Sequence, residues 1–293
     1  MKKIFLTTIL LCAGVVGAFA QTVEIVEVEN RVPLSKNGHE ILPKQGDFGI
    51  SVDAAPFLYY IGNMFNDTQN NPAPYFGNGN YDLTIRGMYF LQNNRSIRAA
   101  LSLDIGNEIF KGTVSDDYAL IQPGYNGQTV IDVEKYSFTN VDLKVGYGFH
   151  RGYRRLQASY GPQIGINYGS GKTAYTYANS IQETNQIPSS YNFGGNIIGG
   201  GRKLEQKYGN IFGVSVGAFV GVEYFIAPRL SISGEIGLGL NMENRWQGET
   251  TIEKWDTSQG KVVENSTRSL NGLTGGINLS TITNGGLFLN FYF

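Results

Sequence analysis

Cysteine and histidine are almost absent from this chain, which has one cysteine and two histidines among 293 residues. The single cysteine, Cys12, has no second thiol with which to form a disulfide, and no Cys/His metal-site spacing occurs. Charge is scarce and balanced, because Lys and Arg number 23 together and Asp and Glu number 24. A net charge so close to zero argues against a nucleic-acid partner. These absences exclude disulfide scaffolds, thiol chemistry and Cys/His metal centres.

Long apolar runs are missing after the first 20 residues, so no segment there predicts a transmembrane helix. The start of the chain has a positive region, a short apolar region and small residues, which is typical of a secretory signal peptide. Its elements are Lys2, Lys3, the apolar run 4–16, and the A-x-A residues Ala18 and Ala20. We expect cleavage after Ala20, which removes residues 1–20 together with Cys12.

Glycine and aromatic residues are abundant, with 39 Gly, 18 Tyr and 17 Phe, as in β-rich exported proteins. The last nine residues show the clearest pattern, because apolar side chains occupy every second position. These side chains are Leu287, Leu289, Phe291 and Phe293. A period of two indicates one apolar face of a β-strand. This ending resembles that of bacterial outer-membrane β-barrels, where the assembly machinery reads a terminal Phe. A soluble sandwich that ends on an edge strand is the alternative.

The same period recurs in eight segments of about ten residues, the length expected of barrel strands that cross a membrane. The segments are 48–60, 81–91, 96–106, 138–149, 155–168, 210–225, 229–241 and about 273–293. Asn284-Gly285-Gly286 is a competing hairpin signal. We interpret it as a glycine kink or bulge within a long eighth strand.

The connections between these segments alternate between short and long. The short ones are 92–95, 150–154 and 227–228, and the long ones are 61–80, 107–137, 169–209 and 242–272. Outer-membrane barrels have short periplasmic turns and long extracellular loops, whereas long loops are uncommon in compact soluble domains. The pattern therefore predicts a barrel domain over 48–293 with both chain ends in the periplasm. Residues 21–47 are expected to be a periplasmic segment, or alternatively a peptide that docks on a partner.

The two faces of the predicted strands differ in a way that favours a barrel. The polar face carries Gly, Ser, Thr, Gln and Asn with few charges, which suits a narrow lumen. The charged residues predicted to share this lumen are Asp82, Arg86, Arg98, Asp104, Asp142, Lys144, Glu223 and Glu235. Burying them unpaired would cost several kcal/mol each, so we expect a mutual ion-pair network.

Aromatic residues gather near the predicted strand ends, as in the girdles at the two interfaces of a membrane barrel. The periplasmic set is Tyr89, Phe90, Phe149, Tyr153, Phe225, Phe291 and Phe293, and the outer set is Tyr59, Tyr60 and Tyr168. The pattern predicts that both sets face outward from the barrel.

No motif predicts catalysis. Residues 169–173 read GSGKT, but a P-loop would need glycine in place of Ile166 and a helix afterwards. His39 lies in the periplasmic segment and His150 in a predicted periplasmic turn, away from the outer leaflet where a lipid-modifying site would lie. We therefore expect a non-enzymatic protein without a cofactor or a metal ion.

The chain resembles the small eight-stranded outer-membrane barrels of the OmpA, OmpX and OmpW kind. It is most like the generic outer-membrane β-barrel proteins of the Bacteroidota, in which stretches similar to residues 37–43 (NGHEILP) lead into the first strand. The resemblance implies an all-β fold, a closed antiparallel up-and-down transmembrane β-barrel of about eight strands in the cell outer membrane. The implied partners are outer-membrane lipid, lipopolysaccharide and the barrel-assembly machinery, with no nucleic acid.

An eight-stranded barrel has a lumen that side chains fill, which makes it a poor general porin. We therefore expect a platform whose outer loops contact envelope or extracellular partners. One alternative is a narrow channel for small or hydrophobic solutes. The other is an accessory barrel of a secretion or uptake complex, with residues 21–47 as its contact to another envelope protein.

Overall fold

The computed structural model describes residues 34, 38, 40–54, 83–124, 126–269 and 274–293. The strands are β1 (Phe48–Asp53), β2 (Leu83–Gln92), β3 (Arg95–Ser115), β4 (Thr129–Tyr153), β5 (Leu156–Thr176), β6 (Ile197–Ile198), β7 (Gly201–Ala227), β8 (Leu230–Arg245), β9 (Glu249–Asp256), β10 (Lys261–Arg268) and β11 (Thr274–Tyr292). The one helix of this part, α3 (Asp117–Leu120), has four residues, and no helix there has the length and hydrophobicity that a membrane crossing requires. The predicted cleavage site at Ala18 and Ala20 lies outside the described residues.

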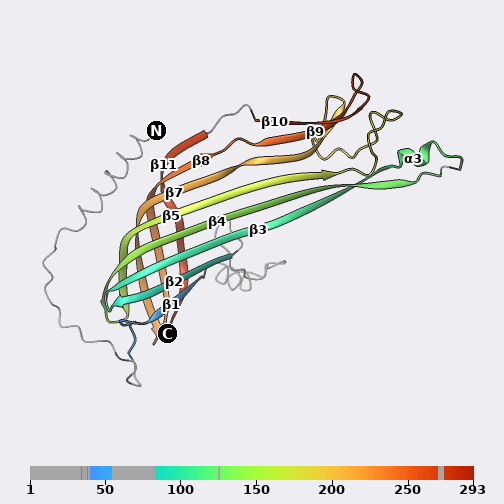
Figure 1. The fold of residues 1–293 in the computed structure, drawn as a ribbon. Coiled ribbons are helices and arrows are strands. Elements are labelled where there is room, and N and C mark those ends of the chain that lie inside the picture. The colour runs from blue at the N-terminus through green and yellow to red at the C-terminus, as the bar shows by residue number, and fades with distance from the viewer. Residues whose placement is uncertain (1–33, 35–37, 39, 55–82, 125, 270–273) are drawn as a thin grey trace.

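The strands form one antiparallel sheet, and eight of them close into a ring (Figure 1). The order around the ring is β1, β2, β3, β4, β5, β7, β8 and β11, and β11 pairs with β1 again. The short β6 and the hairpin of β9 and β10 are attached to β7 outside the ring. The predicted all-β antiparallel arrangement is confirmed.

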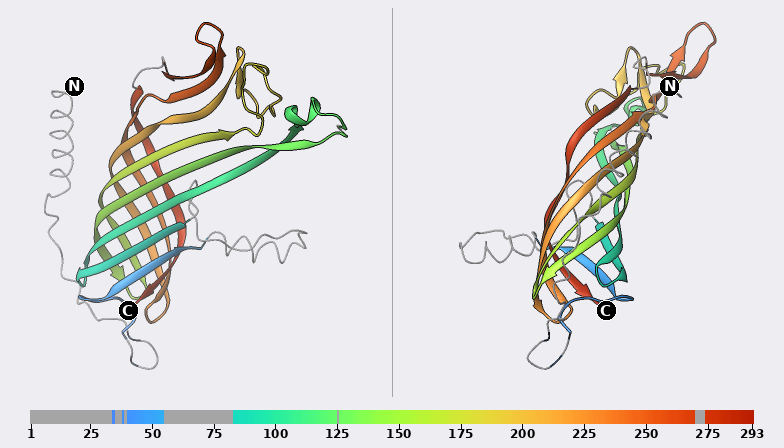
Figure 2. Two further views of the ribbon diagram at one scale, coloured as in Figure 1. Left: turned by 45° about the vertical axis from the view of Figure 1, so that its right-hand side comes forward. Right: turned by 90° about the vertical axis from the view of Figure 1, so that its left-hand side faces the viewer.

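The ring strands are tilted, as their register shows. Ile50 of β1 pairs with Phe291 of β11. If the paired residues are followed from Ile50 through β2 and then around the other strands of the ring, the path returns to β11 at Leu279 and not at Phe291. That path is Gly87, Ala99, Val145, Ile164, Val216 and Leu240. Closing a sheet into a ring demands such a stagger, and the slant of the strands is visible in Figure 2.

At one end of the ring, tight turns join the strands. The turn between β4 and β5 contains Arg154 (φ 57°) and the turn between β7 and β8 contains Arg229 (φ 62°). These turns overlap the predicted short connections 150–154 and 227–228, but each extends one residue further, to Arg155 and to Arg229. His150, however, was predicted in a turn and lies within β4 with its side chain buried. The strand continues past it because its backbone N–H bonds the carbonyl of Asn94 at 2.8 Å.

At the other end, strands continue where long loops were predicted. β3 and β4 pair without a break as far as Ser115 and Thr129, and β5 and β7 also extend beyond the predicted ends. Much of 242–272 forms β9 and β10. The loop predictions over 107–137 and 242–272 were therefore wrong for most of their lengths, and the prediction over 169–209 was wrong at its two ends. The cause is chemical, because these extensions carry polar residues on both faces and lose the alternation that marks a half-apolar strand.

The extensions form a wall on one side of the ring, which we call the outer wall: 105–115 of β3, 129–140 of β4, 169–176 of β5 and 201–211 of β7. It leans away from the ring axis beyond the ends of the shorter β1 and β2 (Figure 2). The predicted loop 61–80 and the predicted start of the second strand lie outside the described residues.

The terminal strand is continuous, as predicted. β11 runs through Asn284-Gly285-Gly286, and its register with β8 shifts between Ile282 and Gly286. A register shift of this kind is a β-bulge or a similar local irregularity. The interpretation as a kink or bulge within one strand, and not a hairpin turn, is confirmed.

The end of the ring that carries the turns is closed by apolar side chains. Ile41 packs with Phe90, Phe225 and Tyr292, and all four are at most 3% exposed. Ile41 belongs to residues 40–47, which precede β1. Backbone hydrogen bonds from Gly46 N to Phe90 O and from Phe90 N to the Asp47 carbonyl hold these residues in place. Phe90 and Phe225 were predicted to lie in the outward girdle, and this was wrong. Each follows an outward tyrosine by one residue, and successive side chains of a strand point to opposite faces.

Candidate functional site

The outer face of the ring is apolar on every strand. One row of cross-strand partners consists of Ile85, Leu101, Leu143, Ile166, Val214, Met242 and Ile277. Ile85 is 53% exposed and Ile166 is 48% exposed. Soluble monomers usually show apolar side chains singly or in limited patches. An exposed apolar belt around a whole ring therefore needs a partner that is itself apolar.

Aromatic side chains border this belt on two sides. The exposed ones near the turns are Phe48, Tyr89, Tyr153, Tyr160, Tyr224, Phe291 and Phe293. On the far side, Tyr168 pairs with Phe212, and both are exposed. Phe149 is half-buried and stacks on Tyr160 at a centroid distance of 5.5 Å. Tyr59 and Tyr60 lie outside the described residues.

The four apolar residues of the terminal strand share the outer face. Leu287, Phe291 and Phe293 are exposed and Leu289 is half-buried, whereas Phe288, Asn290 and Tyr292 between them are buried in the ring. The period of two seen in the sequence is thus the division between the outside and the inside of the ring.

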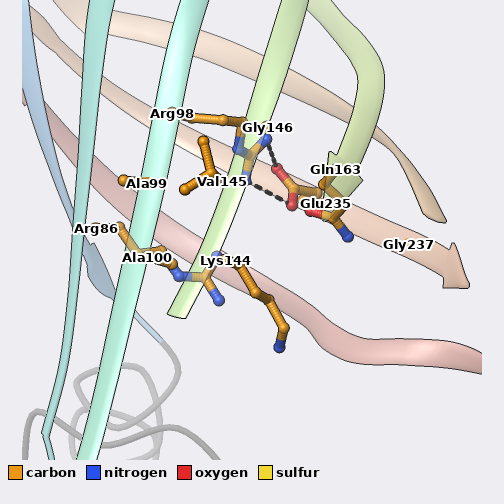
Figure 3. A pocket seen from close by; sticks show the side chains of 10 residues that line it. All are labelled: Arg86, Arg98, Ala99, Ala100, Lys144, Val145, Gly146, Gln163, Glu235 and Gly237. Atoms are coloured by element: carbon orange, nitrogen blue, oxygen red, sulfur yellow. Dashed lines mark hydrogen bonds and ion pairs between the residues drawn. The ribbon is translucent and has the colours of Figure 1, made fainter. Parts of the chain in front are cut away.

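One ionic pair crosses the ring interior, and a second lies along β4. Arg98 of β3 donates two hydrogen bonds to Glu235 of β8, at 2.6 and 2.8 Å, and its guanidinium lies 3.9 Å from the ring centroid of Phe219. Figure 3 shows this bidentate contact spanning the interior. Lys144 lies 3.2 Å from Asp142 on its own strand. Four of the eight predicted lumen charges are therefore in ion pairs.

The remaining predicted lumen charges have other surroundings. Asp104 accepts a hydrogen bond from Asn140 Nδ2 at 3.1 Å. Arg86 is buried against the ring of Phe288, 4.0 Å from its centroid, and its Nε has no hydrogen-bond partner among the described residues. Asp82 lies outside the described residues. Two cavities of about 20 and 40 Å³ flank Arg86, Arg98 and Glu235, which is room for a few water molecules.

Glu223 is held by neutral donors and not by a cation. Its Oε1 accepts hydrogen bonds from Tyr292 Oη at 2.5 Å, from Asn290 Nδ2 at 3.1 Å and from Ser231 Oγ. The sequence placed Glu223 on the inner face but could not identify these partners, because Asn290 and Tyr292 lie more than 60 residues further along the chain. At the end of the ring that carries the tight turns, the interior is thus a hydrogen-bonded polar layer that lies next to the apolar closure formed by Ile41, Phe90, Phe225 and Tyr292.

A buried Ser–His pair lies at the same level. His150 Nε2 is 2.8 Å from Ser96 Oγ, and the exposed fractions are 4% and 0%. The His150 ring also contacts Phe90 at a centroid distance of 4.9 Å. No substrate carbonyl could reach a hydroxyl buried in this way. Across the described ranges, no three His, Cys, Asp or Glu side chains are grouped as a metal site would require.

The outer wall holds the connection 177–200 through buried polar side chains that the sequence did not single out. Asp132 accepts hydrogen bonds from Ala178 N at 2.8 Å and Tyr191 N at 2.9 Å. Arg202 pairs with Glu253 at 2.8 Å and donates to the Asn179 carbonyl at 2.7 Å. These residues lie in predicted loops without any motif, so no sequence signal marked them.

A second set of contacts holds the hairpin tip. Asp117 of α3 accepts hydrogen bonds from Ser189 N at 2.7 Å and Asn185 Nδ2 at 2.8 Å. Partial burial opposes ionisation of Asp117, but these hydrogen bonds and the charge of Arg202 outweigh it and lower its pKa. The tip of the β3–β4 hairpin is thereby fixed to the connection 177–200 by an ionised carboxylate.

Comparisons with known proteins find little. No protein-family model matches the chain, and no curated protein matches it. Among solved structures, a major outer membrane protein from Thermus thermophilus is similar with a TM-score of 0.32 and 13% sequence identity. That match covers 85% of this chain and 99% of the other.

Proposed function

We propose that this protein is an outer-membrane β-barrel whose ring spans the bilayer, with the tight turns on the periplasmic side and the outer wall outside the cell. The observation that carries the proposal is the apolar belt, bordered by aromatic rows, on a ring without free edges. In hydrocarbon every backbone N–H and C=O must find a partner within the protein, and a closed ring of strands meets that condition. The aromatic borders lie where headgroups would begin.

The function that fits this barrel best is a non-enzymatic platform that holds the outer wall at the cell surface. Three features favour it over a channel: the Arg98–Glu235 pair crosses the lumen, Phe219 and Phe288 fill space beside it, and residues 40–47 close the lower end. The braced outer wall presents a fixed surface, as binding sites require. A narrow channel and an accessory barrel that uses residues 21–47 are the alternatives.

Delivery and assembly complete the proposal. Residues 1–20 act as the signal peptide, cleaved after Ala20. The outward side chains Leu287, Leu289, Phe291 and Phe293 provide the strand that the barrel-assembly machinery recognises. Lipopolysaccharide and phospholipid then surround the belt.

Expression of the full chain in a Gram-negative host tests this function. We expect the protein in the outer-membrane fraction. Its measured mass should be that of a chain that starts at Gln21, and its electrophoretic mobility should change on boiling. In planar bilayers the purified protein should give no stable conductance steps, because side chains fill the lumen. Recovery in the soluble periplasmic fraction would contradict the barrel proposal, and stable unitary steps would favour the channel over the platform.

A further inference from the structure

The inner face of the outer wall and the connection 177–200 packed on it carry two groups of contacting aromatic rings, which together we call the aromatic row. Its members are Tyr136, Phe138, Tyr175, Tyr191, Phe193 and Tyr208. Centroid distances are 5.5 Å from Phe138 to Tyr136 and 6.0 Å from Tyr136 to Tyr208. Higher on the wall, Tyr175 lies 6.1 Å from Phe193, and Phe193 lies 4.9 Å from Tyr191.

Register places the row on the face that continues from the lumen. Tyr136 and Phe138 occupy the same alternate positions of β4 as the inward Asp142 and Lys144. Tyr136 pairs with Thr173, whose hydroxyl lies 3.1 Å from Tyr208 Oη. Tyr208 is 44% exposed and Tyr191 is 43% exposed, and the other rings are half-buried.

Glycines on neighbouring strands let the rings lie against the sheet. A Cβ at Gly106 would approach the Phe138 ring to 2.8 Å, and one at Gly112 would overlap the Tyr191 ring. The hydrogen bond from Tyr191 N to Asp132 fixes the upper end of the row. The rings are therefore preorganised, so a ligand would lose little free energy in ordering them.

The row has charges of both signs at its margin, because Tyr175 stacks on Tyr177 at a centroid distance of 6.2 Å and the Arg202 guanidinium lies 4.1 Å from the Tyr177 ring centroid. Burial and the nearby Glu134 carboxylate raise the pKa of Tyr175 to about 12, so its hydroxyl stays protonated at neutral pH. The Tyr208 hydroxyl lies beside Thr173 Oγ1, and the Glu134 carboxylate lies near the Tyr175 hydroxyl. Amphipathic rings of this kind suit a ligand with apolar faces and polar edges.

We propose that the aromatic row binds an extended neutral glycan chain. Sugar rings present C–H faces that stack on Tyr and Phe, and hydroxyl edges that bond to tyrosine hydroxyls and carboxylates. The proposal rests on the proposed function, which places this wall outside the cell. A peptide fits less well, because peptides usually add to a free sheet edge and this row lies on a sheet face. A polyanion fits less well, because the Arg202 guanidinium at the margin is already paired with Glu253 and the Glu134 carboxylate would repel it.

Saturation-transfer NMR and calorimetry test the site, with cellohexaose and maltohexaose as neutral probes and an uncharged hexapeptide as the competing class. The full mature protein is used in a detergent without a sugar headgroup, since such a headgroup could occupy the row. The variants are Tyr208→Ala and Tyr136→Ala, which remove one ring each. Tyr208→Phe keeps the ring, and Tyr118→Ala is the matched control, because Tyr118 is a tyrosine of the same outer region, 73% exposed on α3 and outside the row.

We expect binding of at least one hexasaccharide, weakened about tenfold by each alanine change in the row, as loss of one stacked ring implies. Tyr208→Phe should retain most of the affinity, and Tyr118→Ala should bind as the unchanged protein does. Binding of the peptide alone, or equal affinity in the row variants and the control, would overturn the proposal. Boiling-dependent mobility is measured on each variant, so a correctly inserted barrel that binds no sugar refutes the glycan site while the proposed barrel stands.

Discussion

Replacing Ile164 by arginine is expected to destabilise the protein in a bilayer by about 2–4 kcal/mol. Ile164 is 60% exposed on the outer face of β5, midway along the strand between the outward Tyr160 and Tyr168. If the belt touches acyl chains, the guanidinium must leave water for hydrocarbon or distort the surrounding lipid. Equilibrium urea unfolding in lipid vesicles, followed by tryptophan fluorescence, measures the change.

Thr176→Arg is the matched control for this substitution. Thr176 lies on the same strand and the same face, but at the exposed outer end of β5 beyond the aromatic border. We expect a change within about 0.5 kcal/mol there, as for ordinary surface substitutions. Equal costs at the two positions would mean that Ile164 does not face lipid.

Removal of Arg98 is the second change with a large expected effect. Arg98→Leu leaves Glu235 buried without its bidentate partner, and uncompensated buried charges of this kind cost about 3–5 kcal/mol. The side chains of Arg98 and Glu235 are 17% and 13% exposed, so solvent screens the loss only in part. Chemical unfolding of the purified variant in vesicles should show the loss as a lower denaturant midpoint.

Two further variants separate charge from packing. The double change Arg98→Met and Glu235→Leu should recover most of the loss, because it removes both charges and keeps apolar volume. Lys172→Ala breaks the pair with Glu205, in which Lys172 is 49% exposed, and should cost less than about 1 kcal/mol. A double variant as unstable as Arg98→Leu would show that the ionic pair is not the source of the effect.

The sequence predicted the antiparallel sheet because half of each ring strand is apolar. Where that alternation holds, as from Leu143 to Phe149, strand and outward face were both right. It ends near Asn140 and Tyr168, and there the prediction changed to loop although the hydrogen-bonded ladder continues. Backbone pairing outside an apolar environment leaves no periodic signal in side-chain hydropathy.

The sequence allowed us to predict which residues line the interior, but not which of them pair with one another. Arg98 and Glu235 were both placed in the lumen, yet β3 and β8 are distant in sequence and only the closed ring brings them face to face. The alternation of side chains along the strand could have predicted that Phe90 points inward. Phe90 was instead assigned to the outward girdle, because an aromatic residue near a strand end fits a girdle as well. The outer wall contacts of Asp132 and Arg202 depend on the folded connection 177–200, which has no repeating pattern.

The orientation of the strand faces toward lipid is measured most directly by depth-dependent quenching. Single cysteines replace Leu143, Ile166 and Lys144 in turn in the mature protein, which lacks Cys12, and each carries an environment-sensitive fluorophore in vesicles that contain brominated lipid. We expect strong quenching at positions 143 and 166, where the side chains lie on the exposed apolar belt, and weak quenching at position 144 inside the ring. Equal quenching at all three positions, or none at 143 and 166, would contradict a belt that faces acyl chains.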